Sequence, residues 1–326
     1  MFNADSWLES LNIYVVENIV HSVVALGIVW LVLALFRIRD PISRMRLLLL
    51  PLVLPIFTPI AFYWLFPERQ GMWVLPLDKV LSIRSVFDDP ARWEAFSRVA
   101  GLGLAVVAVF LLLKVAITVI AVTSLPRRFH AVQKGENSHL DALLSAATRG
   151  SSPARPQVLL SPSTSVESFS FGLRKPYLVI SLGLLRRLGD SDIRAALAHE
   201  LGHIRRHDGW LAFLLVSLRH ILIFNPVVHL LGHRLRLESE MAADDAALGI
   251  GISRLAYAQA LLTVSRLSLA RQPSYLGSNT FSSGTRALRQ RVHHILEPSP
   301  SSQRTLHKWL PVMASALLLG VLFFLC

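Results

Sequence analysis

Three long apolar runs constrain the fold of this chain more than any other feature of its sequence. Each is long enough to cross a bilayer as a helix, and they cover residues 13–36, 47–66 and 101–124. A fourth run, 309–326, is near the lower length limit for a span and is preceded by Lys308 at an interfacial position. Because 53% of the residues are hydrophobic, the composition is that of a membrane protein. We therefore predict a mainly α-helical membrane protein with about four transmembrane helices.

The distribution of basic residues predicts the orientation of these spans. Residues 1–12 hold no Lys or Arg, the loop 37–46 is strongly basic, and the loop 67–98 balances basic against acidic residues. Since basic loops stay in the cytoplasm, we expect the N-terminus and Cys326 outside a bacterial inner membrane that the chain crosses several times. The predicted regions are a three-helix transmembrane region (1–124), a cytoplasmic domain (125–308) and a C-terminal transmembrane helix (309–326).

The formal charge of +12 and the single cysteine narrow the function classes. The basic residues are scattered and no nucleic-acid recognition motif accompanies them, so we expect no nucleic-acid partner. We interpret the positive charge as a consequence of membrane topology and of contact with anionic lipid. One cysteine excludes internal disulfides and a cysteine-ligated zinc.

The motif His199-Glu200-Leu201-Gly202-His203 carries the chemistry of the cytoplasmic region. On a helix, residues at i and i+4 share a face, so both imidazoles reach one metal ion. Glu200 then lies beside a metal-bound water as a general base, which is the HExxH arrangement of zinc peptidases. The alternative is a helix that carries two solvated histidines.

The flanks of this motif favour a helix. Asp190, Ser191 and Asp192 offer N-cap and first-turn acceptors. Gly202 costs helix stability relative to alanine, which indicates that something packs close to the backbone there. The apolar stripe consists of Ile193, Ala196, Leu197 and Ile204.

The third zinc ligand must come from elsewhere in the chain. A metzincin would carry a histidine at the position of Gly209, and His207 lies roughly 12 Å along the helix from His199, too far to share one ion.

The site also needs a donor that stabilises the oxyanion formed during peptide hydrolysis. Four histidines are candidates for this role, and the sequence does not choose among them: His207, His220, His229 and His233.

A second helix carries the better candidate, Glu240, with Asp244 one turn later. Glu240 can bind zinc while Asp244 accepts a hydrogen bond from the free N–H of a ligand histidine. Glu238 is the competitor for the ligand role. A solvated acidic face fits Glu238 and Asp245 better, because alanines make the Glu240 side small and packable.

The rest of the cytoplasmic region predicts a small sheet and further helices. We expect strands in 156–161 and 168–181, the second run being broken by Gly172 and Pro176. Residues 163–170 are the stretch we expect to pair with an extended substrate. The expected helices cover 210–232 as one packed helix, then 253–270 and 286–297.

The run 198–208, then Asn225-Pro226, then Glu240 to Asp244 resembles the BlaR/MecR-type membrane-bound zinc metallopeptidases, an antibiotic-sensing signal-transducer family. The stretch 170–180 also matches the strand that precedes the zinc helix in this family. The resemblance implies a gluzincin-like cytoplasmic domain, with Zn²⁺ as the cofactor and Glu200 as the catalytic base. It also implies that the zinc ligands are His199, His203 and Glu240, with Asp244 holding a ligand histidine.

The resemblance implies regulated proteolysis in signal transduction and antibiotic resistance. The implied partners are the bilayer and a peptide or protein substrate, either a transcriptional repressor or the chain itself, cut in the loop 272–284 around Thr280-Phe281. Members of the family carry an extracellular penicillin-binding domain after the last span, and this sequence ends at Cys326, so we expect a sensorless or truncated member.

The alternatives are an HtpX/CAAX-type quality-control membrane protease and a transducer that relies on a separate sensor protein. A scaffolding pseudo-peptidase is disfavoured because every ligand and base position holds a competent residue. The sequence leaves the oligomeric state open.

Overall fold

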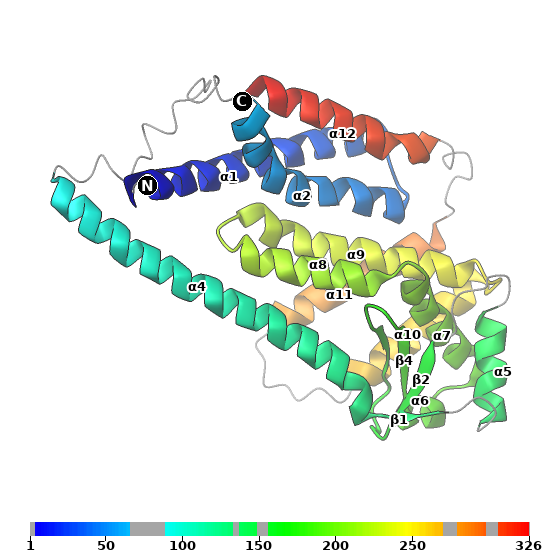
Figure 1. The fold of residues 1–326 in the computed structure, drawn as a ribbon. Coiled ribbons are helices and arrows are strands. Elements are labelled where there is room, and N and C mark those ends of the chain that lie inside the picture. Colours follow the sequence, from blue (N-terminus) through cyan, green and yellow to red (C-terminus); the bar gives the residue numbers. More distant parts are fainter. Residues whose placement is uncertain are drawn as a thin grey trace. The chain divides into compact units, whose positions relative to one another are not determined.

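The chain is mainly helical with a small mixed sheet in a computed structural model that describes residues 4–65, 89–132, 137–148, 156–269, 279–297 and 306–325 (Figure 1). The N-terminal half contains α1 (Ala4–Leu35), α2 (Pro41–Leu65), α4 (Pro90–Ser124), the short 3₁₀ helix η3 (Leu125–Arg128), β1 (His130–Ala131), α5 (Ser138–Ala147) and β2 (Gln157–Ser161). The following elements are β3 (Ser168–Phe171), β4 (Tyr177–Ser181), α6 (Leu182–Arg187), α7 (Asp190–Arg205) and α8 (Asp208–Ile221). The chain then forms α9 (Pro226–Leu248), α10 (Arg254–Leu269), α11 (Asn279–Leu296) and α12 (Leu306–Leu325).

Packing divides the chain into two units that alternate along the sequence. The first unit comprises residues 1–116, 216–235 and 300–326, and the second comprises 117–215 and 236–299. The domain boundaries at residues 124 and 308 stay a prediction.

Apolar helices dominate the first unit, in which α1, α2 and α12 pack against one another. Three segments are long and apolar enough to cross a membrane: Tyr14–Leu35, Pro41–Ile60 and Ala91–Ala121. Each overlaps one of the expected spans. The apolar part of α12, Trp309–Leu322, is shorter, so a fourth span stays a prediction.

Buried polar side chains bind the irregular backbone of this unit. Pro59 has no N–H, so the carbonyl of Pro55 lacks its helical donor, and Asn18 Nδ2 of α1 donates to it over 2.8 Å. Asn225 Nδ2 in turn lies 2.8 Å from Asn18 Oδ1. The freed carbonyl of α2 is therefore satisfied by a neighbouring helix, as apolar surroundings require.

The expectation of one helix over 210–232 is wrong, because α8 ends at Ile221 and α9 begins at Pro226. A residue before proline is disfavoured in the helical region, and proline itself suits the first turn of a helix. Asn225 caps the new helix by accepting the N–H of Val227 over 2.9 Å. The Asn-Pro pair is therefore a helix boundary.

The sheet of the second unit has the strand order β1-β2-β4-β3. β2 and β4 are parallel, with Leu159 opposite Val179, while β3 runs antiparallel to β4, with Ser170 opposite Leu178. The expected break between β3 and β4 is confirmed, and Gly172 there adopts a φ of +112°, a conformation that favours glycine. β3 lies at one edge of the sheet and contacts α7.

Helix α7 lies at the centre of the second unit, against α5, α10 and β3. Its buried face includes Ile193, Leu197 and Leu201, which join the core of the unit. The expected N-cap is wrong: Gly189 is the N-cap and makes no side-chain bond, while Asp190 and Asp192 occupy the first turn. Their charges still favour this helix end through the helix dipole.

The expected close packing at Gly202 is confirmed. A Cβ atom built there would lie 3.1 Å from Ala246 Cβ and 3.2 Å from the carbonyl oxygen of Ala243. Glycine therefore allows α7 to approach α9 closely at the level of the HExxH motif.

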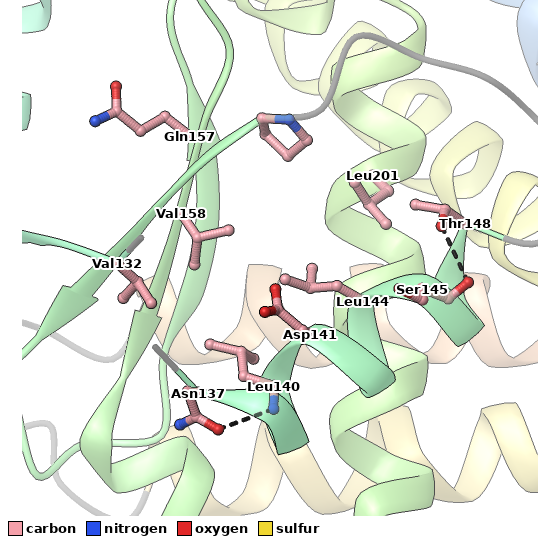
Figure 2. A pocket seen from close by; sticks show the side chains of 11 residues that line it. Val132, Asn137, Leu140, Asp141, Leu144, Ser145, Thr148, Gln157, Val158 and Leu201 are labelled. Atoms are coloured by element: carbon pink, nitrogen blue, oxygen red, sulfur yellow. Dashed lines mark hydrogen bonds between the residues drawn. The ribbon is translucent and has the colours of Figure 1, made fainter. Parts of the chain in front are cut away.

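A pocket lies between α5, β2 and α7, with Leu201 and Val158 among its lining residues (Figure 2). Asn137 at its rim caps α5 by accepting the N–H of Leu140 over 3.0 Å. The pocket is lined by apolar side chains of the core and by polar side chains of α5, and Asp141 contributes a carboxylate.

The predicted C-terminal helices of the second unit correspond to α10 and α11. Helix α11 begins at Asn279, so Thr280 and Phe281 lie in a helix and not in the expected loop. Most of the rest of that loop, through residue 278, lies outside the described residues.

Candidate metal centre and active site

Helix α7 places the two histidines of the motif on one face with their rings together. His199 Nε2 and His203 Nε2 are 3.3 Å apart, and the ring planes make an angle of 89°. Both side chains are largely buried, with 13% and 16% of their surface exposed. This pair follows directly from the i, i+4 geometry of the helix.

Glu240 of α9 completes a group of three ligand atoms. Its Oε2 lies 3.3 Å from His199 Nε2, and its Oε1 lies 3.7 Å from His203 Nε2. Among the described residues, His199, His203 and Glu240 are the group of His, Cys, Asp and Glu side chains whose ligand atoms converge in this way.

The spacing of these atoms fits zinc. Zinc binds nitrogen and oxygen ligands at about 2.0–2.2 Å in a tetrahedron, whose edges are then roughly 3.3–3.6 Å. The two closest pairs, both 3.3 Å, match such edges. Two imidazoles and one carboxylate are also donors that suit zinc, and a fourth position is left for water.

Each histidine is held from behind by a carboxylate. Asp244 Oδ1 lies 3.1 Å from His199 Nδ1, and Asp208 Oδ2 lies 2.6 Å from His203 Nδ1. A hydrogen bond from Nδ1–H to a carboxylate leaves the Nε2 lone pair for a metal and orients the ring. Asp244 was expected in this position from the sequence, whereas Asp208 was not.

Two residues from distant helices surround Asp244. Arg291 of α11 donates through Nε and Nη2 to the two carboxylate oxygens over 2.9 and 2.7 Å. Tyr257 of α10 donates its hydroxyl to Oδ1 over 2.7 Å and lies 3.1 Å from His199 Nδ1. Asp244 is fully buried, so these donors supply what water would supply at the surface.

The carboxylates and His199 shift one another's pKa. Burial lowers the pKa of His199, but hydrogen bonds to Asp244 and Glu240 outweigh this and raise the pKa to about 9. Burial raises the pKa of Glu240, yet its contacts with His199 and the charge of Arg291 bring it down to about 2. Burial likewise opposes ionisation of Asp244, while Arg291 and His199 hold its pKa far below the usual range. The anionic groups thus stabilise positive charge between them, and a divalent cation bound there would supply that charge.

Glu200 is buried beside the two histidines, with 8% of its surface exposed. Ser170 of β3 donates its hydroxyl to Glu200 Oε2 over 2.9 Å. Burial raises the pKa of Glu200, and the charges of His199 and His203 and the bond from Ser170 only partly oppose it. A raised pKa makes the carboxylate a better proton acceptor, which suits a general base.

The competitor Glu238 is not part of this group. It is 1% exposed, so the expectation that it belongs to a solvated acidic face is wrong. Asp245 is more exposed, at 38%, and its Oδ1 lies 2.9 Å from His294 Nε2. Several neighbours of Glu238 on α9 are buried as well, namely Ser239, Ala242, Ala243 and Asp244.

Sequence reasoning missed several residues of the site. Ser170 and Asp208 lie within the stretches 170–180 and 198–208, which carry the family resemblance, but no role was assigned to them. Nothing in their spacing marks them as residues of the site. Tyr257 and Arg291 reach the site only through the packing of α10 and α11, which no local pattern encodes. Two expected oxyanion candidates make local bonds instead, His220 Nδ1 to the carbonyl of Val216 and His229 Nε2 to that of Ile223.

Comparison with known proteins gives a family match across most of the chain. Residues 13–295 match the model of the family described as BlaR1 peptidase M56. Regulatory protein BlaR1 of Bacillus licheniformis is 28% identical over 139 residues, which are 42% of this chain and 23% of that protein. The aligned part is thus about a quarter of the length of that relative.

Relatives with protease names also match. A protease HtpX homolog of Methanothermobacter thermautotrophicus is 26% identical over 136 residues, covering 41% of this chain and 49% of that protein. A second HtpX homolog, from Aeropyrum pernix, is 36% identical over 55 residues, which are 16% of this chain and 17% of that protein. Among solved structures, the crystal structure of S. mikatae Ste24p matches with a TM-score of 0.36 and 17% identity over 74% of this chain and 72% of that chain.

Proposed function

The chain belongs to the M56 peptidase family, and from this premise we propose that it is a membrane-embedded zinc endopeptidase with Glu200 as its general base. The observation that carries the proposal is the convergence of His199 Nε2, His203 Nε2 and the Glu240 carboxylate, whose two closest pairs lie at the spacing of a zinc tetrahedron. Members of a peptidase family act on peptide bonds, and this group of side chains is the place where such chemistry would be organised.

The proposed zinc site consists of His199, His203 and Glu240. A bound zinc ion would polarise the scissile carbonyl and lower the pKa of the attacking water. Asp244 and Asp208 keep the two imidazoles oriented through their Nδ1 atoms. Arg291 holds Asp244 and Glu240 in place and offsets part of their negative charge.

Glu200 has the proton-transfer role in this proposal. It accepts a proton from the attacking water and then donates it to the leaving amine. The hydroxyl of Ser170 fixes Oε2 of this carboxylate, so the other oxygen, Oε1, is left to take the proton.

The edge strand β3 is the proposed docking site for the substrate. β4 covers one edge of β3, and β3 is the last strand of the sheet at the side where Ser170 contacts Glu200. An extended peptide can pair with such an edge through backbone hydrogen bonds. The stretch 163–170 expected for this role overlaps β3 from Ser168 onward.

We propose that the peptidase unit is cytoplasmic and that the chain resides in a bacterial inner membrane with its N-terminus outside. The proposal rests on three apolar helices long enough to cross a bilayer and on the basic loop 37–46 between the first two. We further propose a regulatory role, in which the protease cuts itself or a repressor, and the similarity to regulatory protein BlaR1 supports it. The matches to HtpX homologs favour quality control of membrane proteins as the second candidate.

Comparison of cleaved proteins in cells separates these two roles. Wild type and a Glu200→Gln strain would be compared by quantitative mass spectrometry of new N-termini. A regulatory protease gives Glu200-dependent cleavage of one or two proteins, whereas a quality-control protease gives cleavage of many damaged membrane proteins. Identical sets of N-termini in the two strains contradict the proposal of a peptidase.

A further inference from the structure

The carboxylate of Asp208 is the meeting point of a small polar network behind His203. Its Oδ2 lies 2.6 Å from His203 Nδ1 and accepts the hydroxyl of Ser239 over 2.8 Å. Arg206 donates to it through Nη2, and through Nε to Oδ1 over 3.3 Å. Only 9% of Asp208 is exposed, and the Arg206 charge and the bond from His203 outweigh burial and lower the pKa of this carboxyl.

A residue with a left-handed backbone conformation brings Asp208 close to His203. Helix α7 ends at Arg205, α8 begins at Asp208, and His207 between them has a φ of 55°. Residues other than glycine rarely adopt this conformation. It turns the chain back after α7, so that the side chain five residues after His203 returns to the Nδ1 of that histidine.

Ser239 connects this network to the other metal-binding helix. It directly precedes Glu240 on α9, its hydroxyl donates to Asp208, and its carbonyl accepts from Arg206 Nη2 over 2.9 Å. The α7–α8 turn therefore holds α9 by both the side chain and the backbone of the residue next to Glu240.

We propose that Arg206, Asp208 and Ser239 form a clasp that sets the position of Glu240 relative to His203, and that Ser239 is a positioning residue for the metal centre. The inference rests on the proposed zinc site and adds to it the means by which ligands from two helices are brought into register. A zinc site requires ligand distances within about 0.2 Å of their usual values, so the two helices that carry the ligands must be held in register. The hydrogen bonds of the clasp are directional, and they act on the helical turn of α9 that carries Glu240.

Ser239 is the member of the clasp that can be tested most cleanly. Replacing Arg206 or Asp208 leaves an opposite charge buried, which is strongly destabilising by itself. Ser239→Ala removes one hydroxyl and no charge. Ser268 provides a matched control, because its hydroxyl also donates to one acceptor within the second unit, the carbonyl of Val166, over 2.8 Å.

The experiment measures zinc affinity of the full chain in detergent by competition with a chromophoric chelator. We expect Ser239→Ala to weaken zinc binding about tenfold, the lower end of the range for residues that hold a metal ligand in place. Ser239→Thr, which keeps the hydroxyl, and Ser268→Ala should both stay within about twofold of wild type. In Asp208→Asn, whose own affinity falls about 10- to 100-fold, adding Ser239→Ala should cause little further loss.

The unfolding temperature of each metal-free variant separates positioning from a purely structural role. A structural role lowers that temperature and leaves the zinc affinity of the folded chain unchanged, which overturns the inference. Equal affinity of Ser239→Ala and wild type overturns it too, as does an equal loss in Ser268→Ala. If Ser239→Ala does not fold, the isosteric pair Ser239→Thr and Ser239→Val decides, and equal affinities contradict the clasp. A wild-type chain without measurable zinc affinity instead contradicts the zinc site itself.

Discussion

Arg291 Nη1 lies 2.9 Å from Glu240 Oε2, so the carboxylate proposed to bind zinc also contacts a cation from α11. The same guanidinium binds both oxygens of Asp244. The carboxylates of Glu240 and the buried Asp244 lie one helical turn apart and repel each other. Arg291 offsets this repulsion, and its charge is poorly screened because only 14% of its side chain is exposed.

Arg291→Ala is therefore expected to destabilise the metal-free chain strongly. Removing one partner of a buried ion pair costs about 3–5 kcal/mol, because the remaining charge stays buried without compensation. Zinc should restore part of this loss, since it brings positive charge to Glu240. The measurement is the unfolding temperature with chelator and with excess zinc. A zinc-induced rise no larger in Arg291→Ala than in wild type argues against charge compensation.

Glu200→Gln should separate catalysis from metal binding. The amide keeps the size of the side chain but cannot take a proton from water, so the rate of peptide hydrolysis should fall by about 10²–10⁴-fold. Zinc content should stay close to that of wild type, because Glu200 is not among the three converging ligands. Hydrolysis of a quenched fluorescent peptide and metal analysis of the same sample test this. Retained hydrolysis shows that another group is the base.

Ser170→Ala should change the pH dependence of hydrolysis. The Ser170 hydroxyl donates to Glu200 and so favours the charged carboxylate. Without this bond the pKa of Glu200 rises further, and the acidic limb of the kcat/KM profile moves to higher pH. Ser168→Ala, a change in the same strand, is the control and should leave the limb in place. An unchanged limb in Ser170→Ala shows that the bond does not act on the base.

The stability of the chelator-treated chain should depend on pH on both sides of neutrality. The pKa of His199 is raised to about 9, so its contribution is complete below about 6.5 and is lost as the pH rises through about 9. The pKa of Glu240 is lowered to about 2, so its contribution is complete above about 4.5 and is lost as the pH falls toward about 2. Unfolding temperatures measured from pH 3 to pH 10 should therefore be highest between about pH 4.5 and 6.5. A maximum above pH 8 contradicts the interaction of His199 with its carboxylates.

Much of the candidate site follows from local helix geometry and was predictable for that reason. His199 and His203 form a pair because residues four apart share a helix face, and the same rule pairs Glu240 with Asp244 on α9. The close approach at Gly202 is likewise a local signal, because a glycine in a helix interior costs stability unless something packs there.

The remainder depends on tertiary packing or on weaker signals. Arg291 and Tyr257 meet Asp244 only because α10 and α11 fold back onto α7 and α9, and their sequence neighbourhoods are those of ordinary helices. Glu238 was expected in solvent because the alanines of α9 make the side of Glu240 the packable one, but the packing of the unit buries Glu238 as well, with 1% of its surface exposed. The break at Asn225-Pro226 carries a recognisable local signal, a residue disfavoured in a helix before proline, and the apolar character of both flanks outweighed it in the prediction.

The zinc content of the purified full chain and of its ligand variants tests the proposed zinc site directly; it is measured by elemental mass spectrometry after dialysis against a weak chelator. We expect about one zinc per chain in wild type and in Glu200→Gln, and a small fraction of that in His199→Ala, His203→Ala and Glu240→Ala. Equal zinc content in wild type and Glu240→Ala, with both chains folded, would contradict the proposal that two helices share one metal ion.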